Sequence, residues 1–179
     1  MRDYSTTTRR LALATLITAA LFSGCAPVSL QTESVQTAEQ AIASSERFDN
    51  LSEQQRFLLR TAARFQDEGD HSSARRILQA SPLQQAEDEI SDQQVLLSMA
   101  SIVALEDVFW AESVSKRLTP DHYQRYPEER HAAAVQLQFQ VLGMARETLG
   151  QALLLMSAGP ELSGMEPQAH QDQIWQALK

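Results

Sequence analysis

Residues 52–78 read SEQQRFLLRTAARFQDEGDHSSARRIL, and this stretch decides the fold class of the chain. Its apolar residues recur every three or four positions, which is typical of a helix that buries one face. They are Leu58, Leu59, Ala62, Ala63 and Phe65, then Ala74, Ile77 and Leu78. Gly69 interrupts the pattern and Asp70 starts it again. We therefore predict two helices joined by a tight turn at Gly69, an αα-hairpin.

Each of the first two predicted helix pairs begins with a capping box, in which a serine caps the helix and a glutamine three residues later reaches back to it. Ser52 and Gln55 form the first box, and Ser91 and Gln94 form the second, 39 residues further on. A second pair of helices is expected after the second box, with Trp110 in its core. The apolar residues assigned to that pair are Val95, Met99, Ile102, Val103, Trp110, Ala111, Val114 and Leu118.

A third long helix is predicted from Pro127, which is followed by two acidic residues that suit a first turn. Its partner is predicted over residues 146–157, before Pro160, and a last helix begins near Pro167. The side chains expected in the cores of these helices are Ala132, Val135, Leu137, Phe139, Leu142, Met144, Leu149, Leu153, Met156, Ile174, Trp175 and Leu178.

Helix pairs that recur every 35–40 residues are typical of helical solenoids of the tetratricopeptide-like (TPR-like) type. The 179-residue length suits one domain, and six Gly with six Pro are too few for a sandwich or barrel. We therefore predict an all-α chain with a TPR-like domain over residues 51–179. The alternative is an irregular helical bundle, because Met99 and Glu106 depart from the repeat pattern.

The N-terminus carries the features of a secretory signal. Residues 11–22 contain no charge and, as a helix, span about 18 Å, well short of a hydrocarbon core of about 30 Å. This run favours a signal peptide over residues 1–24 rather than a transmembrane helix. The segment Phe-Ser-Gly-Cys at residues 22–25 resembles the lipobox of bacterial lipoproteins. The alternative is an ordinary signal peptide with an incidental cysteine.

The lipobox resemblance implies cleavage of the bond between Gly24 and Cys25 and attachment of acyl chains to Cys25. The residue that follows Cys25 is Ala26, not the Asp that resembles an inner-membrane retention signal in enteric-type bacteria. We therefore expect an outer-membrane protein facing the periplasm. Residues 25–50 are assigned to the lipidated cysteine and a tether, within which residues 37–48 are expected to form at most a short helix.

Composition excludes several function classes. The net charge is -8, and removal of residues 1–24 with their three cations and one acid makes it -10, which argues against a nucleic-acid partner. Cys25 is the only cysteine, so no internal disulfide can form. The acidic run at residues 87–89 is expected to be a solvated connector or, alternatively, a contact for a basic partner.

The sequence offers no catalytic or metal-binding motif, so we expect neither an enzyme nor a cofactor. Four histidines are scattered along the chain, namely His71, His122, His131 and His170. Glu128 and Glu129 lie near His131, but acids at this place suit the first turn of a helix better than a metal site. No nucleophile elbow or phosphate-binding loop occurs.

The lipobox and helix pairs, with residues 55–78 and the segment Asp-Gln-Ile-Trp-Gln-Ala-Leu at residues 172–178, resemble the N-terminal region of the LpoA family of LppC-type lipoproteins. The resemblance spans residues 22–178, and its most specific parts are the Gly69 turn and the closing Trp-Gln-Ala-Leu. It implies a non-enzymatic outer-membrane lipoprotein that supports peptidoglycan synthesis as the stalk of an activator of a class A penicillin-binding protein.

Members of this family continue into a domain of periplasmic-binding-protein type that contacts the synthase. The present chain stops at Lys179 within a predicted helix, so we expect a truncated chain without that domain. One alternative function is a TPR-like scaffold that binds envelope-assembly partners. A fragment of a cell-wall hydrolase is the least favoured alternative.

Overall fold

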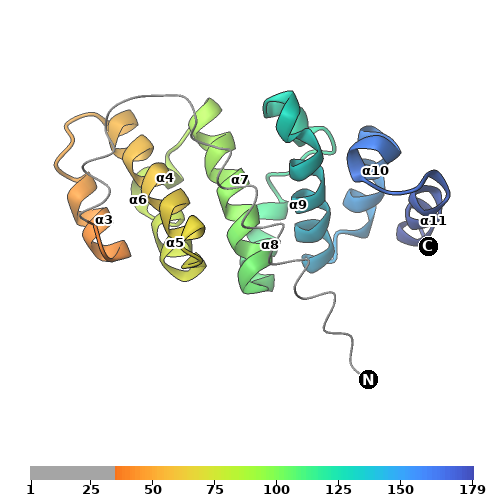
Figure 1. Cartoon of the computed structure of the whole chain (residues 1–179), viewed down its shortest axis with the longest axis horizontal. Helices are drawn as coiled ribbons and strands as arrows, with labels where there is room; N and C mark the ends of the chain where they lie inside the picture. Colours follow the sequence, from red (N-terminus) through yellow and green to blue (C-terminus); the bar gives the residue numbers. More distant parts are fainter. Residues whose placement is uncertain (1–34) are drawn as a thin grey trace, which may run out of the picture. The chain divides into compact units, whose positions relative to one another are not determined.

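The computed structural model describes residues 35–179, and all regular structure in this range is helical. It comprises nine α-helices and two short 3-10 helices, with no strand among the described residues, which confirms the all-α prediction. The predicted signal peptide, Gly24, Cys25 and Ala26 lie outside the described residues. The chain divides into two compact units at the boundary between Leu105 and Glu106, here called the N-terminal and C-terminal units. Figure 1 labels the α-helices of both units.

The N-terminal unit is built around the predicted αα-hairpin. Its helices are α3 (Ala38–Ser45), α4 (Leu51–Asp67), α5 (His71–Leu78), α6 (Ser81–Gln84) and α7 (Asp88–Leu105). Helices α4 and α5 pack on each other, and α7 packs on both. The eight apolar residues predicted for the hairpin core are all buried, including Leu58, Ala62 and Ile77 at 0% exposure. Each large side chain so buried contributes about 1.5–3 kcal/mol of stabilisation.

The prediction that Ser52 and Gln55 form a capping box is wrong. The side chain of Asn50, not Ser52, caps α4, because its Oδ1 accepts a hydrogen bond from the Ser52 N–H at 2.8 Å. Gln55 is buried and donates from Nε2 to the carbonyl of Pro82 at 2.8 Å. Gln55 therefore ties α4 to α6 instead of closing a cap.

The second capping box is also wrong. Helix α7 begins at Asp88, three residues before Ser91, so Ser91 lies within the first turn. Two acids, Asp88 and Glu89, occupy that turn, where the positive end of the helix dipole stabilises negative charge. Gln94 is buried and donates from Nε2 to the Leu78 carbonyl at 2.8 Å, which links α7 to α5.

Helix α3 is the short helix expected within residues 37–48, and it packs on α4 and α5. Val35 and Ala41 are buried at this contact. Two arginines hold the segment by polar contacts: Arg64 donates to the Val35 carbonyl, and Arg76 forms an ion pair of 2.6 Å with Glu39. Val35 and α3 are therefore part of the folded unit, although they lie inside the range of residues 25–50 that was assigned to the tether.

The C-terminal unit contains four α-helices and the two 3-10 helices. They are α8 (Val108–Ser115), η1 (His122–Arg125), η2 (Glu128–Arg130), α9 (His131–Met144), α10 (Thr148–Ser163) and α11 (Pro167–Ala177). Helix α9 packs on α8 and α10, and α10 packs on α11. Trp110 on α8 is buried, as predicted. The third helix begins at His131 rather than at Pro127, because residues 128–130 form a 3-10 turn.

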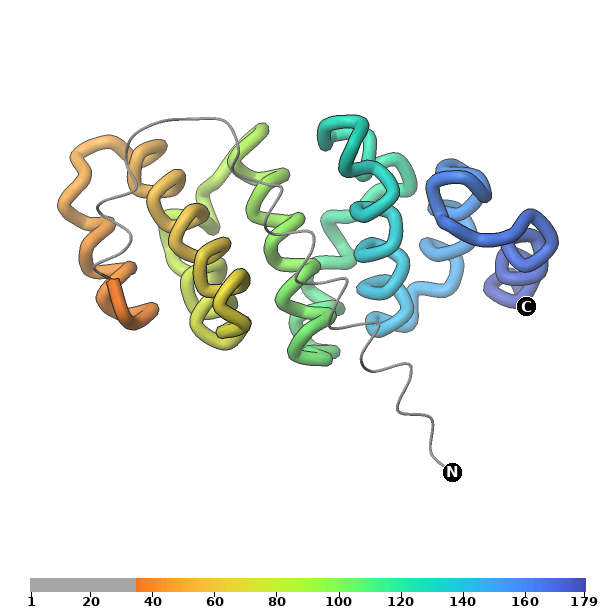
Figure 2. The backbone as a smooth tube through the Cα atoms, viewed as in Figure 1, coloured from red at the N-terminus to blue at the C-terminus, as the bar shows by residue number. Residues whose placement is uncertain are grey.

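Helix α10 changes direction at Gly159, whose φ of 74° lies in the left-handed region (Figure 2). The next residue is Pro160, which has no N–H to continue the helical hydrogen bonds. This break confirms the predicted end of the helix before Pro160. The last helix, α11, begins at Pro167 as predicted.

Three helix-to-helix turns along the chain are built alike. Gly69, Glu106 and Arg146 each have positive φ, at 81°, 53° and 60°, and each directly precedes the N-cap residue of the following helix. These N-cap residues are all acidic, namely Asp70, Asp107 and Glu147. The intervals between the three turns are 37 and 40 residues. The same turn thus recurs at nearly constant spacing.

Buried positions recur in the same register when the chain is aligned on these turns. Residues 11, 8 and 4 positions before each turn, and 9 positions after it, are buried in all three cases. They are Leu58, Val95 and Val135; Thr61, Ser98 and Gln138; Phe65, Ile102 and Leu142; and Leu78, Ser115 and Leu155. The recurrence includes a polar residue at one position, so it is more specific than general hydrophobicity.

Candidate interaction surface

Few of the residues singled out for chemistry come together in the described part of the chain. Gly24, Cys25 and Ala26, the predicted sites of cleavage, lipid attachment and sorting, lie outside it. Among residues 35–179 no group of three or more His, Cys, Asp or Glu side chains could hold a metal ion. Within the same range, none of the helices combines the length and apolar character required to span a membrane.

The histidines of the C-terminal unit have structural contacts. His122 is buried with Nε2 3.1 Å from the hydroxyl of Tyr126, and His131 donates from Nε2 to the Tyr126 carbonyl at 2.9 Å. His170 donates from Nε2 to the Leu155 carbonyl at 3.0 Å, which fixes α11 to α10. These contacts join neighbouring elements and assemble no reactive centre.

His71 begins α5 in the N-terminal unit and is also buried. Burial lowers the pKa of His71, because the charged form is poorly solvated there, while Asp70 opposes this shift. The acidic run at residues 87–89 is exposed to solvent, as expected, but Asp88 and Glu89 lie in the first turn of α7 rather than in a connector.

Exposed apolar side chains are concentrated in the C-terminal unit. Eight large apolar residues are exposed among residues 35–179, and seven of them belong to this unit. The seven are Val108 and Phe109 on α8, Leu149, Leu153 and Met156 on α10, and Trp175 and Leu178 at the end of the chain. In the described part of the N-terminal unit, residues 35–105, Leu51 is the one exposed large apolar side chain.

Five of these seven were predicted to lie in the core, and that prediction is wrong for Leu149, Leu153, Met156, Trp175 and Leu178. Helix α10 is apolar on nearly every side from residue 152 to residue 156. It buries Ala152, Leu154 and Leu155 and leaves the other side exposed. Spacing alone could not identify the buried face, because two apolar faces compete on one helix.

Leu149, Leu153 and Met156 form what we call the α10 seam. Their spacings of four and three residues place them in one narrow row, like the row that pairs two helices in a coiled coil. The residues at the same distances after the Gly69 turn are Ser72, Arg76 and Gln79, all exposed and polar. This comparison shows that the hairpin does not require apolar side chains at these positions.

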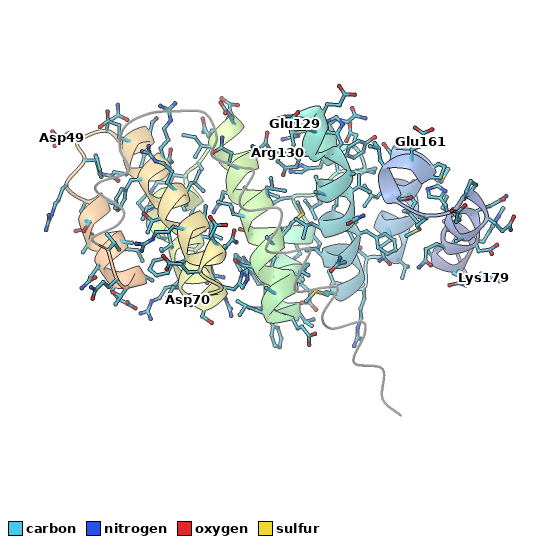
Figure 3. The ribbon with its side chains drawn as sticks, viewed as in Figure 1. Asp49, Asp70, Glu129, Arg130, Glu161 and Lys179 are labelled. Carbon is cyan, nitrogen blue, oxygen red and sulfur yellow. The ribbon has the colours of Figure 1, made fainter. Side chains whose placement is uncertain are left out.

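Two further apolar side chains lie on the neighbouring helix. Trp175 is 59% exposed and Leu178 is 48% exposed, and they are three residues apart. Residues 146–179 also contain four exposed acids and only two basic residues. The acids are Glu147, Glu161, Glu166 and Asp172. Figure 3 shows Glu161 on α10 and Lys179 at the end of the chain. Residues 146–179 therefore combine exposed apolar side chains with a net negative charge.

The chain matches no protein-family model, no curated protein and no solved structure.

Proposed function

We propose that this protein is a lipid-anchored helical adaptor of the bacterial outer membrane that supports peptidoglycan synthesis by positioning a partner protein. The observation that carries the proposal is the contrast between the two units. Residues 35–105 of the N-terminal unit expose one large apolar side chain, whereas the C-terminal unit exposes seven. Several large apolar side chains left exposed in one unit are typical of a protein with a binding partner.

The adaptor is a TPR-like solenoid in this proposal. Support comes from the three equivalent turns at Gly69, Glu106 and Arg146 and from the buried positions that recur around them. Repeats of this kind bury their apolar faces against neighbouring helices and offer exposed helix faces for binding. Their function is to present a surface, which requires no catalytic group.

The anchor is the acylated Cys25. Three acyl chains at about 0.8 kcal/mol per buried CH₂ give a stable attachment, unlike one chain alone. Ten residue steps separate Cys25 from Val35, the first residue that the structure describes, and they reach at most about 35 Å. The contacts of α3 with Arg64 and Arg76 then connect the anchored end to the hairpin. The N-terminal unit is accordingly held close to the membrane.

The resemblance to LppC-type lipoproteins indicates a class A penicillin-binding protein as the partner whose synthesis is supported. In that family the synthase is contacted by a domain that follows the helical region. The present chain supplies the helical stalk in this proposal, and its exposed apolar side chains give it a contact of its own with the partner. A second candidate is a scaffold for other envelope-assembly proteins, which would use the same α10 seam.

The test is fractionation combined with affinity capture of the full chain from the cell envelope. Wild-type protein is expected to sediment with outer membranes and to capture a class A penicillin-binding protein. Cys25→Ser is expected to remain in the soluble fraction. Membrane sedimentation of Cys25→Ser would contradict the anchor, and capture of β-barrel precursors without a synthase would replace the first candidate function by the second.

A further inference from the structure

We infer that the partner docks on the C-terminal unit by placing a cationic amphipathic α-helix along the α10 seam and against Trp175. This inference rests on the proposed adaptor function and specifies the chemistry of its partner.

The first argument concerns the shape of the occupant. The spacings of four and three residues between Leu149, Leu153 and Met156 match the apolar row of a second helix. An extended strand presents side chains at a period of two, which does not follow such a row. Peptide helices commonly dock through apolar anchors with these helical spacings. The seam therefore fits a helix.

The second argument concerns the composition of the surface. Trp175 is 59% exposed, and an exposed tryptophan supplies a large apolar contact of the kind that dominates binding energy. Met156 is 62% exposed and has a flexible thioether side chain that adapts to different apolar partners. Met156 and two leucines lie on α10 and Trp175 lies on α11, and the two helices are joined by the hydrogen bond from His170 to the Leu155 carbonyl.

The third argument is charge complementarity. Residues 146–179 have a net charge of -2, with four exposed acids against Arg146 and Lys179. A second copy of the chain would bring two acidic surfaces together, and an anionic bilayer would add phosphate charge to the same acids. Both arrangements are repulsive at short range. A helix with an apolar row flanked by lysine or arginine matches both the apolar α10 seam and the net negative charge of residues 146–179.

The experiment measures peptide binding to the full lipidated chain in phosphatidylcholine nanodiscs. The probe is a helical peptide of about 20 residues, long enough to be helical, with leucine in an apolar row and lysine on both flanks. A matched peptide carries glutamate in place of lysine. Binding is followed by the emission of Trp175, since Trp110 is buried at 8% exposure, and signal from empty nanodiscs is subtracted.

The lysine peptide is expected to bind and to shift the emission of Trp175 to shorter wavelength. Its binding is expected to weaken at high salt. The glutamate peptide is not expected to bind. Leu153→Glu is expected to weaken binding by about tenfold or more, because it removes an apolar anchor. Gln79→Glu, at the register-equivalent position of Met156 on α5, is the control for added charge and is expected to leave binding unchanged. Circular dichroism checks that both variants keep their helix content.

Equal binding of the two peptides, or unchanged binding to Leu153→Glu, would overturn the inference. Concentration-dependent self-association in sedimentation that Leu153→Glu abolishes would also overturn it and assign the seam to a second copy. These results are distinguishable from failure of the proposed function, which is decided by membrane release of Cys25→Ser and by capture of the synthase.

Discussion

The two units of this protein use the same turn design but treat their apolar residues differently. In the N-terminal unit, the hairpin residues predicted to be core are buried, and its outward positions carry Ser72, Arg76 and Gln79. In the C-terminal unit, the equivalent outward positions carry Leu149, Leu153 and Met156. Packing within the hairpin is satisfied in both cases. The additional apolar row is therefore a property of the surface of the C-terminal unit.

The turns differ between the units as well. The N-terminal unit places glycine at the left-handed position, whereas the other two turns place Glu106 and Arg146 there. A side chain in this conformation costs about 1–2 kcal/mol relative to the right-handed region. Glu106 and Arg146 adopt the same positive φ as Gly69 despite this cost. The backbone geometry of the turn is therefore more constant along the chain than the residue type at its left-handed position.

The largest expected effect on stability distinguishes the buried face of α10 from its exposed face. Leu155→Ala is expected to lower the free energy of unfolding by about 2–5 kcal/mol, because Leu155 is fully buried and the change leaves a cavity. Leu153→Ala, two residues away and 40% exposed, is expected to change it by less than about 0.5 kcal/mol. Urea denaturation followed by circular dichroism measures both. Equal destabilisation would remove the distinction between core and seam.

Substitutions at the left-handed positions of the turns are expected to change the free energy of unfolding by smaller amounts. Gly69→Ala is expected to destabilise the N-terminal unit by about 1–2 kcal/mol. The cost is conformational, since an added Cβ meets nothing within 4 Å. Glu106→Gly and Arg146→Gly are expected to stabilise the chain by up to about 1 kcal/mol each, because relief of strain exceeds the added entropy of the unfolded state. Thermal denaturation reports the sign, and destabilisation by both glycines would refute the shared turn geometry.

The cap of α4 gives a further test within the N-terminal unit. Asn50→Ala is expected to cost about 1 kcal/mol of stability, because it removes the acceptor of the Ser52 N–H. Ser52→Ala is the matched control, with no expected loss, since the Ser52 hydroxyl does not act as the cap. Chemical denaturation distinguishes the two variants. A larger loss for Ser52→Ala would restore the capping box predicted from sequence.

The smallest expected effect is the dependence of stability on pH through His71. Its pKa is lowered on folding by burial, so the unfolded chain binds more protons below about pH 6.5. The contribution of His71 is therefore fully present above that pH and is lost as the pH falls toward the lowered pKa of the folded state. His71→Gln is expected to lose less stability than wild type between neutral and mildly acidic pH. Identical pH profiles of unfolding would contradict this assignment.

Sequence periodicity predicted the hairpin at residues 51–78 because one helix face is apolar, the opposite face is polar, and glycine marks the turn. It also predicted the break at Gly159 and Pro160 and the start of the last helix near Pro167, because glycine permits positive φ and proline cannot continue the helical hydrogen bonds. The caps were misassigned because Asn50 and Ser52 are both good N-cap residues. Only the backbone conformation of Asn50, extended before the helix, distinguishes them.

The candidate interaction surface could not be predicted, for a different physical reason. A helix with apolar residues on two sides, such as α10, gives no signal for which side is buried until its neighbours are placed. The left-handed conformation of Glu106 and Arg146 has no signal of its own in the sequence, since glycine is the usual marker. The repeat spacing does place Glu106 at the position of Gly69, 37 residues further along, and Arg146 follows Glu106 by another 40 residues.

The most direct test of an adaptor that binds through its C-terminal unit is site-specific photocrosslinking in the cells that make it. A photoreactive amino acid is placed either at Leu153, on the seam, or at Gln79, which lies on the outward face of α5. The account predicts a discrete crosslinked product at Leu153 and none at Gln79. A Leu153 probe that yields no product, or a Gln79 probe that yields the same one, would contradict it.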